Sequence, residues 1–437
     1  MYREAIKDLE NWKNSKTRKP LVLYGARQVG KTWLMQEFGR LSYQRVAYVV
    51  MAENPRMTEL FNGNSDVSSI ISGLEAEVGF GFDSENTLVV LDEIQEVPKA
   101  VSALKYIYEQ APEYHFMAAG SLLGLTTMGN ISFPVGKVDS MTLFPLTFSE
   151  FVRAVKSDKF VQMLEERNSK LLESFHSALN DLLKQYFVVG GMPEAVKNFA
   201  EDGDYFKVRN IQGQIVRDYE RDFGKHAPTN FLPRIQMVWN SVPSQLARDN
   251  KKFLYGALKT GARAKDFELA IEWLASAGLV HKIRRVNAAK VPLKHYEDLS
   301  AFKLFMNDIG LLGALSNLEP RIILEKNDIF VEYKGALSEQ FVAQQLFSTG
   351  VPIYYFSSDD AKTEIDLMVE VGGLPVPIEI KSAENLNSKS LTYFVAKHKI
   401  SRALKFSLLP EKRTGVIYNE PLYFAEYAQR LVEYSAG

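Results

Sequence analysis

A glycine-rich octapeptide near the start of the chain constrains its fold more than any other segment. Residues 25–32 read Gly-Ala-Arg-Gln-Val-Gly-Lys-Thr and follow the apolar run of residues 21–24. Residues 32–38 then have the apolar spacing of an amphipathic helix. A strand, a glycine-rich turn and a helix in this order form a loop whose backbone N–H groups can enclose phosphate groups. The segment therefore predicts a phosphate-binding loop in an α/β domain.

Each part of this loop has an expected role toward a nucleoside triphosphate. Lys31 would reach the β- and γ-phosphates, and the hydroxyl of Thr32 would bind Mg²⁺. Gly25 and Gly30 would keep Cβ atoms away from the phosphates. The residues expected to surround the nucleotide are Gly25, Ala26, Arg27, Gln28, Val29, Gly30, Lys31, Thr32 and Trp33. We therefore expect the chain to bind ATP together with Mg²⁺.

Residues 1–150 alternate strand-like and helix-like segments, which is typical of a parallel sheet covered on both faces. The strand-like runs are 21–24, 45–51, 87–91 and 115–119. The third run is followed by Asp92 and Glu93, at the sheet edge where doubly wound folds bind their ligands. Asp92 would hold Mg²⁺ through its water shell, and Glu93 would polarise the water that attacks the γ-phosphate.

The fourth strand leads to Ser121. In the expected topology this strand lies between the loop strand and the strand that carries the acids. Ser121 would then hydrogen-bond the attacking water or the γ-phosphate. A serine between a strand and a helix is also an ordinary N-cap, and the sequence leaves both interpretations open.

The composition bounds the class of protein. A chain of 437 residues can hold about two to four domains. The net charge of −1 means that any nucleic-acid binding must depend on local basic patches. The absence of cysteine excludes disulfides, zinc–thiolate sites and thiol nucleophiles. Without a secretory signal or a long apolar stretch, we expect a cytoplasmic protein that does not contact a membrane.

Several of these segments carry a family resemblance. Residues 25–32, 88–93, 120–123, 143–151 and 190–194 resemble a bacterial and archaeal family of AAA-type ATPases with a C-terminal domain similar to PD-(D/E)XK nucleases. With this resemblance, the expected fold is a P-loop NTPase α/β domain followed by three further regions. The expected divisions are an ATPase domain over 1–150, a helical lid over 151–204, a winged-helix-like domain over 205–322 and an α/β nuclease-like domain over 323–437.

The family usually carries an arginine where this chain has Lys137. A lysine supplies charge without the bidentate fork of an arginine, and we expect Lys137 to be an exposed, solvated residue. Arg217 and Arg221 share a helix face at four-residue spacing. We expect them to pair with the neighbouring acids Asp218 and Asp222 rather than to act as transition-state arginines.

Residues 205–322 have the pattern of a winged helix. Segments 254–260 and 264–277 are expected to form a helix-turn-helix, with 279–286 and 302–306 as the strands of a wing. Basic residues on or near the wing are suited to contact DNA phosphates: Lys282, Arg284, Arg285, Lys290, Lys294, His295 and Lys303. The acidic residues of the second helix would repel phosphate, and winged helices also dock proteins, so both kinds of partner stay open.

Residues 323–437 contain a second chemical constellation. Glu379 and Lys381 share one face of a strand, and Asp366 lies near the start of the strand paired with it. Glu339 would project from the preceding helix as a supplementary acid. The resemblance to PD-(D/E)XK nucleases implies that Asp366, Glu379 and Glu339 bind Mg²⁺ or Mn²⁺ while Lys381 orients a water beside a phosphate.

Two functional hypotheses follow. In the first, Mg²⁺-dependent ATP hydrolysis controls DNA binding, and metal-dependent DNA cleavage, by the C-terminal region. In the second, the chain is a nucleotide-gated interaction module whose nuclease-like fold is a non-catalytic scaffold. An exposed strand face also alternates apolar residues with Glu and Lys, so the motif alone does not decide between them. The oligomeric state and any arginine finger stay open.

Overall fold

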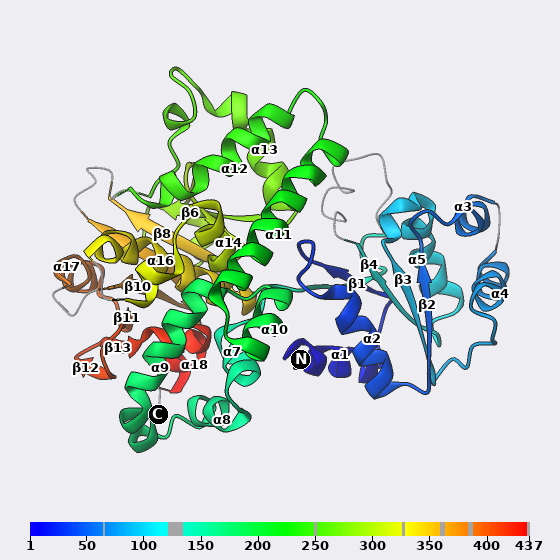
Figure 1. Cartoon of the computed structure of the whole chain (residues 1–437), viewed down its shortest axis with the longest axis horizontal. Helices are drawn as coiled ribbons and strands as arrows, with labels where there is room; N and C mark the ends of the chain where they lie inside the picture. The colour runs from blue at the N-terminus through cyan, green and yellow to red at the C-terminus, as the bar shows by residue number, and fades with distance from the viewer. Residues whose placement is uncertain are drawn as a thin grey trace. The chain divides into compact units, whose positions relative to one another are not determined.

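The computed structural model of the chain divides into two compact units (Figure 1). The N-terminal unit comprises Tyr2–Phe144 with Ser276–Gly278, and the C-terminal unit comprises Pro145–Ala275 with Leu279–Gly437 and Met1. The structure describes residues 1–63, 66–120, 134–248, 251–325, 328–358, 363–382 and 388–434, without the side chains of 328–333 and 433–434. Ser121, predicted to contact water or to cap a helix, lies outside the described residues.

The N-terminal unit is built on a parallel sheet. Its strands are β1 (Leu21–Tyr24), β2 (Arg45–Val50), β3 (Thr87–Asp92), β4 (His115–Ala119) and β5 (Asp139–Thr142). They are ordered β2-β3-β4-β1-β5, and every neighbouring pair is parallel. The four predicted strands form with ends within one residue of those expected. β4 lies between β1 and β3, as predicted, so the segments after these three strands meet at one edge of the sheet.

Helices cover both faces of this sheet, as predicted. They are α1 (Ala5–Asn14), α2 (Lys31–Ser42), α3 (Pro55–Asn62), α4 (Val67–Val78) and α5 (Pro98–Gln110), with the 3-10 helix η1 (Ile94–Glu96). α3, α4 and α5 share an apolar cluster with Val89 and Leu91 of β3. The alternate residues of β3 point to the other face, where Gly39 of α2 lies close to Leu88.

The C-terminal unit contains a mixed sheet of eight strands. They are β6 (Val280–Val286), β7 (Glu297–Met306), β8 (Ile353–Ser357), β9 (Glu364–Val371), β10 (Leu374–Ile380), β11 (Ala403–Ser407), β12 (Lys412–Thr414) and β13 (Ile417–Pro421). Their order is β12-β13-β11-β10-β9-β8-β6-β7. β6 and β7 pair as the antiparallel hairpin expected for a wing, but β6 also pairs in parallel with β8. The hairpin therefore belongs to the same sheet as β8 to β13, and this sheet extends across the domain boundary expected at residue 322.

The remaining helices of the C-terminal unit flank this sheet or form a helical layer. They are α7 (Phe148–Val155), α8 (Asp158–Glu166), α9 (Ser169–Val189), α10 (Pro193–Asp202), α11 (Tyr205–His226), α12 (Leu232–Leu246), α13 (Ala264–Ser276), α14 (Ile309–Leu315), α15 (Pro320–Leu324), α16 (Asp328–Ser348), α17 (Lys389–His398) and α18 (Ala428–Tyr434), with 3-10 helices η2 (Tyr255–Ala257), η3 (Leu293–Tyr296) and η4 (Leu422–Tyr427). α16 packs against β7, β8 and β10, and α17 packs in an apolar cluster with β8 and β9 (Figure 1).

One of the two helices predicted for the helix-turn-helix does not form, so that prediction is wrong. The segment 254–260 contains only the single turn η2, whereas the second predicted helix is present as α13. The backbone explains the difference, because Lys252 bridges to Lys303 of β7 and the N–H of Phe253 donates to the carbonyl of Phe302 at 2.8 Å. The chain thus leaves the edge of the sheet in extended form, and Gly256 does not favour a helix there.

The Gly-Gly-Met-Pro turn after α9 is held by a buried aspartate. Asp308 Oδ2 accepts from the N–H of Gly191 at 2.6 Å and from Gln344 at 3.1 Å. Gly190 has φ 68°, and a Cβ there would lie 2.2 Å from Asp308 Oδ1. The turn therefore requires glycine because a carboxylate fills the space beside it.

Candidate functional site

The phosphate loop has the backbone conformation that its glycines predict. Gly25 has φ 142° and Gly30 has φ 95°, and Gln28 between them also has a positive φ of 63°. A Cβ on Gly25 would lie 2.3 Å from the carbonyl oxygen of Leu143. α2 begins at Lys31, so the loop leads directly into a helix N-terminus, which favours bound anions. The loop can therefore present backbone N–H groups to phosphate.

Lys31 folds back into the loop. Its side chain is 7% exposed, and its Nζ donates to the carbonyl oxygens of Gly25 and Ala26, each at 2.8 Å. Burial lowers the pKa of Lys31 to about 8, although the nearby carboxylates of Glu93 and Asp92 act in the opposite direction. The ammonium group is thus held among oxygen atoms in the position from which it can turn to a phosphate.

The side chain of Asp92, at the end of β3, accepts hydrogen bonds from α2, from β2 and from the backbone of the next residue. Its Oδ2 accepts a hydrogen bond from Thr32 Oγ1 at 2.8 Å and a second from the hydroxyl of Tyr48. Its Oδ1 accepts from the N–H of Glu93 at 3.0 Å. The structure therefore brings together Thr32 and Asp92, the two residues predicted to hold Mg²⁺ in the ATPase half. A hydroxyl beside a carboxylate is a suitable donor set for Mg²⁺ and its water shell.

Tyr48 is a site residue that the sequence did not reveal. It lies on β2, and its pKa is raised by burial and by its hydrogen bond to Asp92. Tyrosine is common in strands, so the sequence alone gave Tyr48 no role. Only the pairing of β2 with β3 in the structure shows that it lies beside Asp92. In this arrangement Tyr48 fixes the carboxylate that faces Thr32.

Glu93 leaves the end of β3 in a left-handed conformation, with φ 54°. Its Oε2 accepts from Gln95 Nε2 at 2.6 Å. The backbone strain of a non-glycine residue in this region is typical of functional sites. Gln95 was also missed from the sequence, because nothing in the pattern links it to its neighbour two residues earlier.

A buried arginine supports the loop from the N-terminal segment. Arg3 is 4% exposed and donates to the carbonyls of Val29 at 2.9 Å and Phe144 at 2.6 Å. It thereby ties the apex of the phosphate loop to the segment after β5. No local pattern indicates this role, because the contact spans most of the N-terminal unit.

The other predicted cations have ordinary partners. Lys137 is 38% exposed and pairs with Glu109 at 2.9 Å. Arg221 pairs with Asp218 at 3.3 Å on an exposed face of α11, and Arg217 donates to Gln214 at 2.9 Å. Arg221 thus pairs with Asp218 as expected, whereas the contact of Arg217 is to a neutral glutamine and Lys137 forms an ion pair where a solvated lysine was expected.

The four predicted residues of the nuclease-like motif come together in the C-terminal unit. Glu379 is 4% exposed, and its Oε1 lies 2.5 Å from Lys381 Nζ. Asp366 lies across the β9–β10 hairpin, where its Oδ2 accepts from the N–H of Ile380 at 2.7 Å. Glu339 of α16 is 5% exposed and adjoins the same group.

Two further lysines enter this group. Lys303 of β7 is 1% exposed, and its Nζ lies 2.8 Å from Glu364 Oε1 and 3.8 Å from Glu339 Oε2. Lys251 pairs with Glu339 Oε1. We name these seven residues the acid–lysine cluster: Lys251, Lys303, Glu339, Glu364, Asp366, Glu379 and Lys381. The prediction that Lys303 contacts DNA phosphate is wrong, because its ammonium group is buried among carboxylates.

The cluster shifts the pKa values of its acids in different directions. Burial would raise the pKa of Glu339, but Lys251 and Lys303 outweigh it and lower that pKa below its ordinary value. Although part of Asp366 reaches the surface, desolvation and the carboxylates of Glu339 and Glu379 raise its pKa to about 8. This upward shift favours the neutral form of Asp366, with which the three remaining carboxylates of the cluster would balance its three lysines.

The predicted divalent cation does not fit this arrangement well. Across the parts of the chain that the structure describes, no group of three or more His, Asp or Glu residues is arranged to hold a metal ion. Glu339 Oε2 is a buried oxygen without a hydrogen-bond donor, but Lys303 is the cation beside it. The carboxylates of the cluster face ammonium groups, whereas a metal ion would need several carboxylate oxygens that converge on one point.

The basic residues of the predicted wing are mostly paired as well. Lys282 lies 2.7 Å from Glu272 of α13. On the same hairpin, Arg284 pairs with Glu297 at 3.2 Å and Arg285 pairs with Asp298 at 2.7 Å. This surface therefore presents fewer available cations than the sequence predicted.

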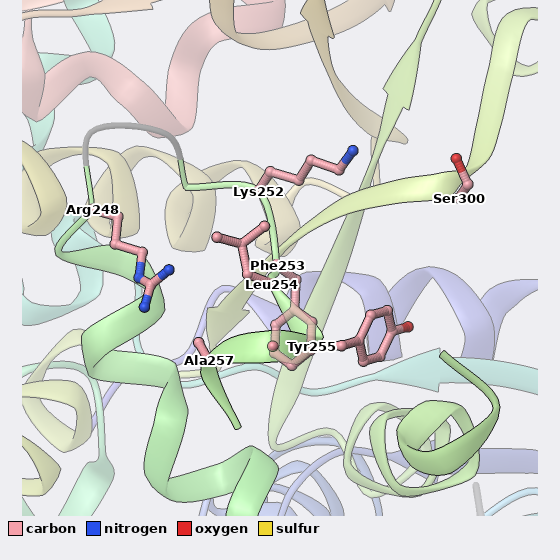
Figure 2. A pocket seen from close by; sticks show the side chains of 8 residues that line it. Arg248, Lys252, Phe253, Leu254, Tyr255, Ala257 and Ser300 are labelled. Carbon is pink, nitrogen blue, oxygen red and sulfur yellow. The ribbon is translucent and has the colours of Figure 1, made fainter. Parts of the chain in front are cut away.

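A basic pocket of about 500 Å³ opens beside the edge of the eight-stranded sheet (Figure 2). It is lined by Arg248, Lys252, Phe253, Leu254, Tyr255, Gly256, Ala257 and Ser300. In Figure 2, the side chains of Arg248 and Lys252 extend from different parts of the lining, with the ring of Tyr255 pointing away from Arg248. The ring of Phe253 stacks on Phe302 with centroids 5.2 Å apart. Two cations in a lining that contains no acid make this a suitable surface for an anionic ligand.

Models of known domains match most of the chain. An AAA domain model matches residues 17–152, a domain of unknown function (DUF8612) matches residues 180–321, and a domain of unknown function (DUF4143) matches residues 334–420. The first match coincides with the parallel sheet and its phosphate loop. The N-terminal unit is therefore similar to an AAA domain, which confirms the α/β parallel sheet with a phosphate loop as that part of the predicted fold. The winged-helix and nuclease-like assignments stay predictions.

Two relatives are 26% identical to this chain over 384 residues, which cover 83% of this chain and 70% of theirs. They are the uncharacterised proteins Mb2031c of Mycobacterium bovis and Rv2008c of Mycobacterium tuberculosis. They are similar along most of their length, and their names assign no activity.

Solved structures with weak similarity include the Walker-type ATPase PABY2304 of Pyrococcus abyssi, with 13% identity and a TM-score of 0.44, covering 72% of this chain and 95% of that one. The ORC1 protein of Aeropyrum pernix in complex with DNA has 14% identity and a TM-score of 0.27, covering 72% and 91%. At such TM-scores these similarities carry no argument about function. No described helix is both long and apolar enough to cross a lipid bilayer.

Proposed function

We propose that the N-terminal unit binds Mg²⁺–ATP and hydrolyses it, and that its nucleotide state controls DNA binding by the C-terminal unit. The observation that carries the ATPase proposal is the 2.8 Å hydrogen bond between Thr32 Oγ1 and Asp92 Oδ2. It places the helix that follows the phosphate loop beside the acid end of β3. Bound Mg²⁺ would neutralise charge on the β- and γ-phosphates at this point.

The residues of the site then have separate tasks. Lys31 would exchange its two carbonyl partners for phosphate oxygens, and the loop N–H groups would enclose the phosphates. Glu93 would leave Gln95 and accept a proton from the attacking water. Asp92, held by Tyr48, would position the water shell of the metal.

The ATPase proposal is tested by measuring Mg²⁺-dependent phosphate release from ATP. Glu93→Gln should reduce turnover at least about 100-fold while nucleotide binding persists, because the variant cannot accept the proton. Glu96→Gln, an exposed acid three residues away, is the matched control and should keep wild-type turnover. Equal loss in both variants, or turnover unaffected by Glu93→Gln, would exclude this assignment of the base.

The DNA part of the proposal is supported by the basic pocket that contains Arg248 and Lys252. Arg248→Glu together with Lys252→Glu should weaken DNA binding at least about tenfold in a fluorescence anisotropy titration. Lys197→Glu, at an exposed position on α10, is the control for charge alone. Titrations with ADP and with a non-hydrolysable ATP analogue should give different DNA affinities.

A second candidate function is supported by the ion pairs of the β6–β7 hairpin. Because Lys282, Arg284 and Arg285 already pair with acids, the hairpin suits a nucleotide-gated interaction module that recruits a protein. This candidate predicts that DNA binding is weak and indifferent both to nucleotide and to the Arg248→Glu/Lys252→Glu change. Nucleotide-dependent DNA binding that requires this pocket would favour the first proposal.

A further inference from the structure

The acid–lysine cluster joins segments that are distant in the sequence. Glu339 comes from α16, Glu364 and Asp366 come from β9, and Glu379 comes from β10. Lys303 comes from β7, the strand at one edge of the sheet, and Lys251 comes from the segment just before the bridge to β7. These contacts therefore link the edge of the sheet to its middle and to the helix that packs on it.

Each acid in the cluster already has a donor from the protein. Glu339 Oε1 pairs with Lys251, Glu364 Oε1 lies 2.8 Å from Lys303 Nζ, and Glu379 Oε1 lies 2.5 Å from Lys381 Nζ. Asp366 Oδ2 accepts from the N–H of Ile380. A hard divalent cation needs several free oxygens that converge on one point. In each of these acids one carboxylate oxygen is directed toward a lysine or a backbone N–H, and the buried Oε2 of Glu339 has Lys303 Nζ as its neighbouring cation at 3.8 Å.

Lys303 is held in place by more than its acids. Its side chain is 1% exposed, and its ammonium group lies over the ring of Tyr355 at 4.9 Å. A lysine buried to this degree is stable only where carboxylates compensate its charge. The lysine and the acids therefore require one another.

We propose that the ammonium groups of Lys303 and Lys251 take the place of a divalent cation in this cluster, so that the C-terminal unit does not bind Mg²⁺ or Mn²⁺ there. The cluster serves instead as an ionic junction that fastens β7 and the segment at residues 251–253 to α16 and β9. This inference does not depend on whether the N-terminal unit hydrolyses ATP.

Direct metal binding by the full chain tests the proposal first. Mn²⁺ is titrated into nucleotide-free Asp92→Asn protein, which removes the acid of the ATPase half, and free Mn²⁺ is followed by electron paramagnetic resonance. The expected result is no saturable binding that depends on the cluster, so that adding Asp366→Asn and Glu379→Gln changes nothing. One bound Mn²⁺ per chain that this addition abolishes would overturn the proposal.

Removing charges from the cluster tests whether it acts as an ionic junction. Lys303→Met leaves the carboxylates uncompensated and should lower the Tm by about 6–10 °C. Combining it with Glu364→Gln removes a charge of each sign and should recover part of that loss. Lys282→Met, which breaks a partly exposed pair on the adjacent strand, is the control and should lower the Tm less.

Lysine variants of the cluster also distinguish an ionic junction from a metal site. Mn²⁺ should raise the Tm of Lys251→Met/Lys303→Met, in which oxygens are released, and should leave the wild-type Tm unchanged. A Lys303→Met protein as stable as the wild type, with no benefit from Glu364→Gln, would contradict the junction. If the lysine variants do not fold, the Mn²⁺ titration of Asp92→Asn still decides the question.

Discussion

The buried position of Lys31 predicts that ATP binding is linked to a proton. In the free protein the pKa of Lys31 is lowered from 10.5 to about 8, chiefly by burial. Phosphates would bind the charged form, and their negative charge would raise that pKa in the complex. Raising the pH through 8 therefore removes the charge from the free site, and ATP binding above that pH must recover a proton.

The size of the effect follows from this pKa. Lys31 is about nine-tenths protonated at pH 7, half protonated at pH 8 and about one-tenth protonated at pH 9. The affinity for a non-hydrolysable ATP analogue should fall about tenfold between pH 7 and pH 9. Binding at pH 8 should take up about half a proton. With the ordinary pKa of 10.5, both effects would be close to zero at these pH values.

Isothermal titration calorimetry measures both quantities. Titrations at pH 8 in buffers with different ionisation enthalpies give the number of protons taken up, and titrations from pH 7 to pH 9 give the affinity profile. Excess Mg²⁺ keeps the protonation state of the analogue constant. A flat affinity profile with no proton uptake at pH 8 would show that Lys31 is charged throughout, and would refute the argument from its burial.

Three further predictions concern the same site. Gly25→Ala should abolish ATP binding in a fluorescence titration and lower the Tm, because its Cβ would lie 2.3 Å from the carbonyl oxygen of Leu143; normal ATP affinity would contradict this close approach. Tyr48→Phe removes one donor to Asp92, so half-maximal ATPase activity should need a higher Mg²⁺ concentration, whereas Mg²⁺-free nucleotide affinity should not change. Arg3→Met removes two donors from backbone carbonyls and should weaken ATP binding by about five- to tenfold; unchanged affinity would show that the loop needs no such support.

Local pattern predicted much of the N-terminal unit. The apolar runs that became β1 to β4 are short and bounded by turns, and the loop glycines, expected to keep Cβ atoms away from phosphates, have positive φ values that a side chain would rarely adopt. Asp92 and Thr32 meet because the ends of parallel strands lie at one sheet edge, which follows from topology alone. Tyr48 and Gln95 could not be found in this way, because their roles depend on side-chain direction.

In the C-terminal unit, local sequence patterns predicted some of the contacts of the acid–lysine cluster but not all of them. Strand alternation correctly placed Asp366, Glu379 and Lys381 together, since it fixes which residues share a face. The pairing of Lys303 and Lys251 with these acids depends on β6 joining β8 across about seventy residues of sequence, and no local pattern specifies that contact. The residues 254–260 have helical spacing, but their neighbours bond to β7, and the sheet edge determines their conformation.

The most direct test of the central claim is the steady-state rate of Mg²⁺-dependent ATP hydrolysis by the purified chain, measured beside Lys31→Ala. We expect the wild type to release phosphate only when Mg²⁺ is present, and Lys31→Ala to release none above the uncatalysed background. Hydrolysis by Lys31→Ala at the wild-type rate, or a wild type that neither binds nor hydrolyses ATP, would contradict the account.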